Sequence, residues 1–259
     1  VLIMWLGELI TQHGIGNGMS LLIFTSIIAR FPISLVKSFQ VASSYIILIA
    51  IVVSIIIVGA IVLMEKGQRR IPVQYAKRIV GRKVYGGQST YIPLKVIQAG
   101  VIPIIFASSV LLFPGTMAQF FKGRFFQVMA NALSPTAPLF LILYAGLIIF
   151  FTYFYTAITF NPIDVSDNMK KYGGFIPGVR PGQPTALYIN RIMSRITLPG
   201  AMFLALIAVI PTILMGAMNV PFLAQFGGTS ILIIVGVVLE TLEQLEAQLL
   251  MRHYKGFLK

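Results

Sequence analysis

A run of twenty residues without one charged side chain, "SYIILIAIVVSIIIVGAIVL" at 44–63, is the feature that most restricts how this chain can fold. About 20 residues of α-helix cross the hydrocarbon core of a bilayer, and so long an apolar run is typical of a membrane span. Only 10% of the residues are charged and the mean hydropathy is +0.89, whereas soluble domains carry about 25% charged residues. The sequence therefore predicts a membrane protein.

Apolar segments of similar length recur along the chain and predict an all-α membrane protein, a polytopic bundle of transmembrane helices. Six complete spans are expected, at 19–36, 44–64, 99–117, 137–160, 197–216 and 229–250. Residues 1–10 have the composition of the end of a seventh span, so we expect a fragment that begins inside a membrane helix. Pro103 and Pro211 fall inside expected spans and favour kinks there, because proline frees a backbone carbonyl.

Two neighbouring spans must divide the uncharged region 196–239, which is too long for one crossing. Residues that interrupt helices lie in its second half and predict the break between the two spans. They are Asn219, Pro221, Gly227 and Gly228.

Lysine and arginine are distributed unequally between the two sides of the expected bundle. Alternate connections hold sixteen basic residues on one side, in 65–96, 161–196 and 251–259, and four on the other. Basic residues concentrate on the cytoplasmic side of membrane proteins. We therefore expect the loops 65–96 and 161–196 and the C-terminus to be cytoplasmic.

The two expected cytoplasmic loops are longer than most connections between helices, which favours a functional role. The first contains "RRIPVQYAKRIVGRK" at 69–83, with six basic residues and no acidic one. Such a segment can serve topology and contact anionic lipids, at about 1 kcal/mol per basic residue. The number of basic residues, interrupted by Pro72, Tyr75 and Tyr85 rather than by acidic residues, instead favours a docking surface for a polyanion.

Signatures of catalysis are missing from the sequence. It has no GxxxxGK[ST], HExxH or GxSxG pattern and no cysteine, and its two histidines, His13 and His253, lie near opposite ends. We therefore expect no enzyme activity, no catalytic residue, no cofactor and no metal site. The glycine-rich "GIGNG" at 14–18 is interpreted as a tight turn before a helix.

Acidic residues within the six spans are confined to Glu240, Glu243 and Glu246, toward the cytoplasmic end of the last one. An ion-coupled transporter usually holds carboxylates near mid-membrane. The position of the three glutamates favours a passive conduit or a scaffold without a pore. A small-solute secondary transporter remains the alternative function.

Five stretches resemble the SecY family of bacterial protein-translocation channels, in the family's order and with its loop lengths. They are "GIGNGMSLLIF" at 14–24, "QSTYIPLKV" at 88–96, "GVIPIIFASS" at 100–109, "DNMKKYGGFIPGVRPG" at 167–182 and "GGTSILI" at 227–233. The resemblance covers the end of the fourth helix and helices five to ten of a ten-helix family. It implies that residues 1–259 are the C-terminal half of such a channel, located in the bacterial cytoplasmic membrane.

The resemblance also implies a channel that passes unfolded polypeptides across the membrane and releases hydrophobic segments sideways into lipid. Its partners would be SecE-like and SecG-like small membrane subunits, signal peptides, nascent chains and anionic lipids. A SecA motor or a ribosome would drive transport from the cytoplasmic loops. Contacts to ribosomal RNA would involve its phosphate backbone, so they would depend on salt and not on base sequence.

The same resemblance implies roles for three groups of residues. A hydrophobic pore ring would comprise Met19, where the family typically has isoleucine, and Ile23, Ile105 and Ile233. A lateral gate would comprise Ile97, where many relatives have asparagine, and Gln98, Pro103, Ser108, Ser109 and Phe113. Partner docking would involve Arg69, Arg70, Lys77, Arg78, Arg82, Lys83 and Arg180, the last on a loop restricted by its prolines.

Overall fold

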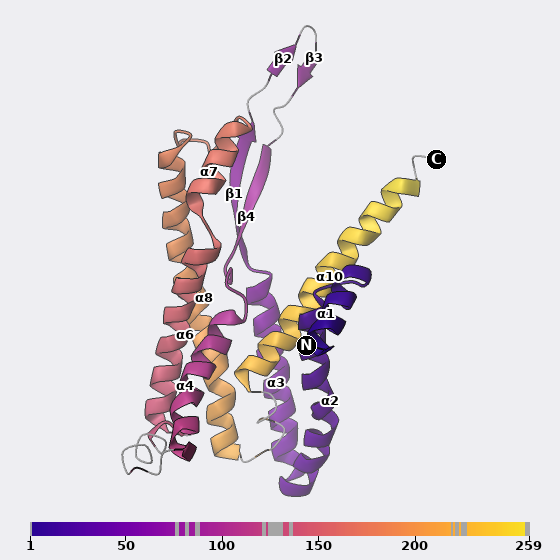
Figure 1. The fold of residues 1–259 in the computed structure, drawn as a ribbon, viewed down its shortest axis with the longest axis vertical. Helices are drawn as coiled ribbons and strands as arrows, with labels where there is room; N and C mark the ends of the chain where they lie inside the picture. Colours follow the sequence, from indigo (N-terminus) through magenta and orange to yellow (C-terminus); the bar gives the residue numbers. More distant parts are fainter. Residues whose placement is uncertain are drawn as a thin grey trace. The chain divides into compact units, whose positions relative to one another are not determined.

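The fold is that of a computed structural model (Figure 1). It describes residues 2–75, 78–80, 83–85, 89–120, 123, 132–134, 137–218, 220, 223 and 227–256. The helices are α1 Leu2–His13, α2 Gly18–Val41, α3 Ser44–Glu65, α4 Ile102–Phe120, α6 Pro138–Thr159, α7 Pro162–Lys171, α8 Gln183–Met218 and α10 Gly228–Gly256. The strands are β1 Gln68–Tyr75, β2 Arg78–Val80, β3 Lys83–Tyr85, β4 Ser89–Lys95 and β5 Gly174–Phe175.

Long apolar helices dominate the fold, which confirms the predicted polytopic helix bundle. Four segments of the described chain have the length and hydropathy to cross a membrane: Gly18–Val41, Ser44–Glu65, Pro138–Lys171 and Gln183–Leu214. The apolar helix Ile102–Met117 is shorter, and α10 is long but carries three glutamates. The predicted break between the last two spans is confirmed, because α8 ends at Met218 and α10 begins at Gly228.

The chain folds as two compact units. The first comprises Val1–Leu63, Ser108–Tyr144 and Leu206–Lys259, and the second comprises Met64–Ala107 and Ala145–Ala205. Helices α3, α4, α6 and α8 contribute residues to both units. Both basic segments expected as loops, 65–96 and 161–196, fall within the ranges of the second unit.

In the first unit, the "GIGNG" segment forms the predicted tight turn, between α1 and α2. Gly16 has a φ of +88°, a left-handed conformation that glycine adopts without strain. The Asn17 side chain accepts hydrogen bonds from backbone N–H groups in the first turn of α2 and so caps that helix. The Thr11 hydroxyl of α1 accepts a 2.9 Å hydrogen bond from the Gly18 N–H. The turn therefore fixes how α1 meets α2.

In the second unit, the basic segment 65–96 forms a β-ribbon where a loop was expected. β1 and β4 pair in antiparallel fashion, from Gln68 opposite Lys95 to Gln74 opposite Ser89. β5 pairs with the other edge of β1, and β2 pairs with β3 at the far end of the ribbon (Figure 1). A two-stranded ribbon is only marginally stable alone in water, so packing against other elements must support this one.

A buried apolar core joins the ribbon to the segment 161–196. It combines residues of β1, β4, α7 and α8 with one residue directly after β5: Ile71, Val73, Leu94, Met169, Ile189 and Met193, and Ile176. Burying each such side chain contributes about 1.5–3 kcal/mol. The expected connection 161–196 has secondary structure of its own, since it contains α7, β5 and the first turns of α8. The two basic segments form one folded body.

The prediction of a helix kink at Pro103 is wrong. α4 begins at Ile102, so Pro103 lies in the first turn of the helix. Backbone N–H groups of a first turn have no helical partner, and proline is tolerated there without loss of a hydrogen bond. Pro114 lies inside α4 instead.

Candidate partner-docking and channel sites

Arg180 lies in the loop between β5 and α8, in the second unit. Its side chain is exposed, whereas Ile176, four residues earlier, is 3% exposed and belongs to the apolar core. Gly178 and Gly182 have φ values of +83° and +98°, where an L side chain would be strained. The glycines of "PGVRPG" thus permit a tight loop that is anchored in the core and exposes the guanidinium.

Two buried hydroxyl groups hold the backbone of this loop. Thr185 Oγ1 donates a 2.9 Å hydrogen bond to the carbonyl oxygen of Arg180, and Ser166 Oγ donates a 2.7 Å bond to that of Gly182. Thr185 is 2% exposed and Ser166 is 1% exposed. The carbonyl groups of the residues on either side of Pro181 are therefore fixed to α8 and α7.

Arg69 and Arg70 are exposed on β1, near the start of the ribbon. Successive side chains of a strand point to opposite faces. Arg69 therefore shares a face with Ile71 and Val73, which are buried in the core, and Arg70 points to the other face. The ribbon presents two basic faces rather than one flat patch.

Arg78 and Lys83 of the other four predicted docking residues lie farther along the same basic segment, on β2 and β3. Lys77 and Arg82 fall outside the described residues. Arg78 is opposite Tyr85 and Lys83 is opposite Val80 in the β2–β3 pair. Strand pairing therefore brings Arg78 and Lys83 into one short hairpin.

The four expected pore-ring residues lie on three helices. Met19 and Ile23 are four residues apart on α2 and so share a helix face, and they are 39% and 43% exposed. Ile233 is half-buried on α10, which contacts α2 in the first unit. Ile105 is 41% exposed and belongs to the second unit. Met19 is also held by α1, since a Cβ added to Gly7 would come 2.6 Å from its sulfur. Convergence of the four stays a prediction.

The expected gate residues occupy the turn before α4 and the part of that helix up to Phe113. Ile97 is 4% exposed and Pro103 is fully buried, so both pack inside the second unit. Gln98 is exposed in the turn, and Ser109 and Phe113 are exposed four residues apart on α4. Gln98 is thus the polar side chain that this turn presents, while Ile97 serves packing. The gate itself stays a prediction.

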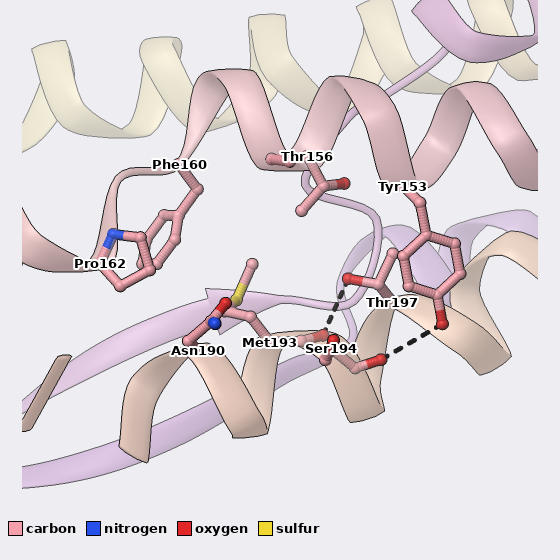
Figure 2. A pocket seen from close by; sticks show the side chains of 9 residues that line it. Tyr153, Thr156, Phe160, Pro162, Asn190, Met193, Ser194 and Thr197 are labelled. Carbon is pink, nitrogen blue, oxygen red and sulfur yellow. Dashed lines mark hydrogen bonds between the residues drawn. The ribbon is translucent and has the colours of Figure 1, made fainter. Parts of the chain in front are cut away.

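A pocket of about 70 Å³ lies between α6 and α8 within the second unit (Figure 2). On one side the Tyr153 hydroxyl donates a 3.4 Å hydrogen bond to the Ser194 carbonyl oxygen. Thr156 also lines the pocket, and its buried hydroxyl has no hydrogen-bond partner among the residues that the structure describes. One turn earlier, Thr152 donates to the Ile148 carbonyl at 2.6 Å. The pocket therefore contains an unsatisfied hydroxyl whose neighbour in the same helix is satisfied.

The family model described as SecY matches residues 1–242. This chain belongs to the SecY family. The protein translocase subunit SecY of Streptomyces coelicolor is 54% identical over 264 residues, an alignment that covers 99% of this chain and 60% of the relative. That of Mycobacterium leprae is 50% identical over 273 residues, covering 100% of this chain and 61% of the relative. The chain thus spans about 60% of the length of the curated relatives it matches.

Two solved structures of protein-conducting or protein-translocation channels share the fold. One, from work on how the SecY plug domain stabilises the closed translocation channel, has a TM-score of 0.64 at 21% identity and covers 95% of this chain and 63% of its own. Another, of a protein-conducting channel, has a TM-score of 0.58 at 20% identity and covers 95% of this chain and 62% of its own. Membership of the SecY family removes the small-solute secondary transporter from the alternatives.

Sequence reasoning missed the two residues whose hydroxyl groups hold the Arg180 loop, Ser166 and Thr185. Ser166 lies sixteen residues before its partner Gly182, and no local pattern links the two positions. Thr185 carries a weak signal, because it falls in the first turn of a helix that Pro184 helps to begin. The two hydrogen bonds depend on the tertiary structure, which brings α7 and α8 to the same loop.

Proposed function

We propose that this chain contributes to a channel that passes unfolded polypeptides across the bacterial cytoplasmic membrane and releases hydrophobic segments into it. The chain supplies a path and docking surfaces and catalyses no reaction. The observation that carries the proposal is the single folded body in which the β-ribbon, α7 and the start of α8 share a core and expose Arg69, Arg70 and Arg180. A body with a packed core loses little conformational entropy when a partner docks.

Two driving partners fit this body. Arg180 presents a planar fork of donors on a fixed loop, which suits two-point binding of a carboxylate on a SecA-like motor. The two basic faces of the ribbon suit the phosphate groups of ribosomal RNA, since such contacts are electrostatic and carry no base specificity. We therefore assign the loop chiefly to the motor and the ribbon chiefly to the ribosome.

The positive-inside rule supports the topology that we propose. It places the second unit's basic surface and the C-terminus in the cytoplasm and makes the chain a multi-pass protein of the cytoplasmic membrane. Anionic lipids would contact basic residues near the membrane surface. SecE-like and SecG-like subunits would cover part of the apolar surface, such as Ile55 and Ile56 of α3, which are 66% and 64% exposed.

We propose that Met19, Ile23, Ile105 and Ile233 close the path for ions. A ring of aliphatic side chains excludes water, and it can deform around a nascent chain because no directional bond closes it. Signal peptides would leave toward lipid beside α4, past the exposed Ser109 and Phe113. A scaffold without a pore would need neither an aliphatic ring nor a path toward lipid beside α4.

The docking role is tested by SecA-driven export into vesicles whose SecY contains this chain. Arg180→Lys keeps the charge but removes the planar fork, and Arg180→Ala removes both. Loss of a charge-assisted hydrogen bond should slow export by about tenfold or more in each variant. Arg191→Lys, at an exposed position of α8, is the matched control and should export normally. The amount of SecY in the membrane should not change, and full export by Arg180→Ala would overturn the docking role.

A further inference from the structure

Ser166 and Thr185 use their hydroxyl groups differently from several threonines in the long helices. Thr152, Thr159 and Thr197 each donate to the carbonyl oxygen four residues earlier in their own helix. Ser166 of α7 instead donates across sixteen residues to Gly182, and Thr185 of α8 donates back to Arg180. Both hydroxyls thus serve the loop between β5 and α8.

The two bonds act on the carbonyl groups of Arg180 and Gly182, the residues on either side of Pro181. Proline fixes its own φ, so once the carbonyls of Arg180 and Gly182 are held, few backbone rotations remain in this part of the loop. A third bond, from the Val179 N–H to the Ile176 carbonyl at 3.0 Å, closes the side of the loop next to β5. The Arg180 side chain stays exposed, while the backbone on either side of Pro181 is held by the buried hydroxyl groups of Ser166 and Thr185.

Removing either hydroxyl should loosen the loop more than the core. Ser166 and Thr185 are buried at the base of the loop, but neither belongs to the apolar cluster formed by the ribbon, α7 and α8. Thr185→Val preserves the shape of the side chain and the apolar contacts while it deletes the donor. The Arg180 carbonyl would then lose its bond from Thr185.

We propose that Ser166 and Thr185 are positioning residues that preorganise Arg180 for docking of an anionic surface of the motor. Neither side chain contacts the partner; they act through the backbone of the arginine. A loop that is already ordered loses less conformational entropy on binding, so the clamp lowers the motor concentration needed for export. The proposal rests on the docking role of Arg180 proposed above.

The functional test measures export as a function of SecA concentration. Loss of one neutral hydrogen bond corresponds to about a three- to tenfold change in an equilibrium. Thr185→Val and Ser166→Ala should therefore raise the half-maximal SecA concentration by about that factor, with the rate at saturating SecA nearly unchanged. Thr185→Ser keeps a donor at the same position and should restore near-normal behaviour. Equal defects in Thr185→Val and Thr185→Ser would overturn the proposal.

A double variant separates positioning from general folding. If Thr185 acts only through Arg180, Thr185→Val should add nothing in an Arg180→Ala background, a non-additivity expected of coupled residues. An additional loss of export in the double variant would show that Thr185 supports the fold instead.

A mobility measurement keeps this proposal distinct from the docking proposal. The chain contains no cysteine, so Arg180→Cys gives this chain a single site for a nitroxide label. The label should be more mobile when Thr185→Val or Ser166→Ala is added, whether or not Arg180 binds the motor. Unchanged mobility would overturn the clamp, whereas increased mobility with unaltered export by Arg180→Ala would overturn only the docking role.

Discussion

The backbone of Gly200 in α8 lies so close to Val96 that no side chain fits between them. A Cβ added to Gly200 would come 2.7 Å from the carbonyl oxygen of Val96 and 3.2 Å from its Cγ1. Val96 directly follows β4, so this contact seats the end of the ribbon against α8. A backbone carbonyl cannot move aside as a flexible side chain can, and the close approach therefore depends on glycine.

Gly200→Ala should lower the stability of the protein by about 1–3 kcal/mol, the usual cost of overpacking. Gly146 in α6 is the matched control, since a Cβ there would meet nothing within 4 Å. Gly146→Ala should be neutral or stabilising by up to about 1 kcal/mol, because alanine favours helix. Thermal unfolding of both variants in detergent checks this, and equal melting temperatures would contradict it.

Replacing all four ring residues, Met19, Ile23, Ile105 and Ile233, with glycine should make the membrane leak ions. A wider and less apolar constriction would no longer dewet, so conductance across a planar bilayer should rise well above that of the unaltered channel. The control replaces four exposed apolar residues of the same helices with glycine: Ile28, Ile33, Leu112 and Val238. If both sets leaked equally, the four residues would not form the seal.

A photoreactive amino acid at Ser109 or Phe113 should crosslink to the signal peptide of an arrested preprotein. Both positions are exposed on α4, and a segment leaving the channel beside this helix would pass within reach. Ile55 on α3 is apolar and is 66% exposed, close to the 62% of Phe113, so it serves as the control and should give a several-fold lower yield. Similar crosslinking yields from all three positions would contradict the prediction that α4 forms part of the lateral gate.

Arg70→Ala should weaken ribosome binding and reduce its dependence on salt. Loss of one phosphate contact lowers the slope of log affinity against log salt concentration by about one unit. Arg69→Ala should have a smaller effect, because Arg69 lies on the strand face that carries the buried Ile71 and Val73. Ribosome binding measured at several salt concentrations between about 50 and 300 mM tests the difference. Identical slopes for both variants would argue against two separate faces.

Thr156→Val should stabilise the protein by about 1 kcal/mol, because it removes a buried hydroxyl that has no partner in the described part of the chain. Thr152→Val is the matched control in the same helix. It removes a satisfied donor, whose 2.6 Å bond to Ile148 would be lost, and it should destabilise by about 1 kcal/mol. Opposite shifts in melting temperature are expected, and a loss of stability in Thr156→Val would mean that its hydroxyl is satisfied in the pocket.

Local chemistry was enough to predict much of this fold. Uninterrupted apolar runs marked the long helices, because a span depends on the hydrophobicity of consecutive residues. Gly16 and Asn17 marked the turn before α2, since positive φ and helix capping are properties of single residues. The same reasoning failed at Pro103, whose effect depends on where the helix begins, and helix ends are set by neighbouring contacts.

The basic segments show what the sequence by itself could not determine. "QRRIPVQY" contains only two buried apolar residues, Ile71 and Val73, too short an alternation to mark a strand. The strand that pairs with this segment begins at Ser89. The residues of α7 and α8 that pack against Ile71 and Val73 lie about a hundred residues farther along the chain.

The sequence by itself determined that the chain is a helical membrane protein of SecY type with basic connections, because those properties follow from composition, consecutive hydrophobicity and local motifs. Only the tertiary structure decided that the two connections form one body, that Ser166 and Thr185 hold the Arg180 loop, and that Gly200 must lack a side chain beside Val96. Each of these depends on residues far apart in the chain, whose contacts arise from packing and strand register rather than from any local propensity.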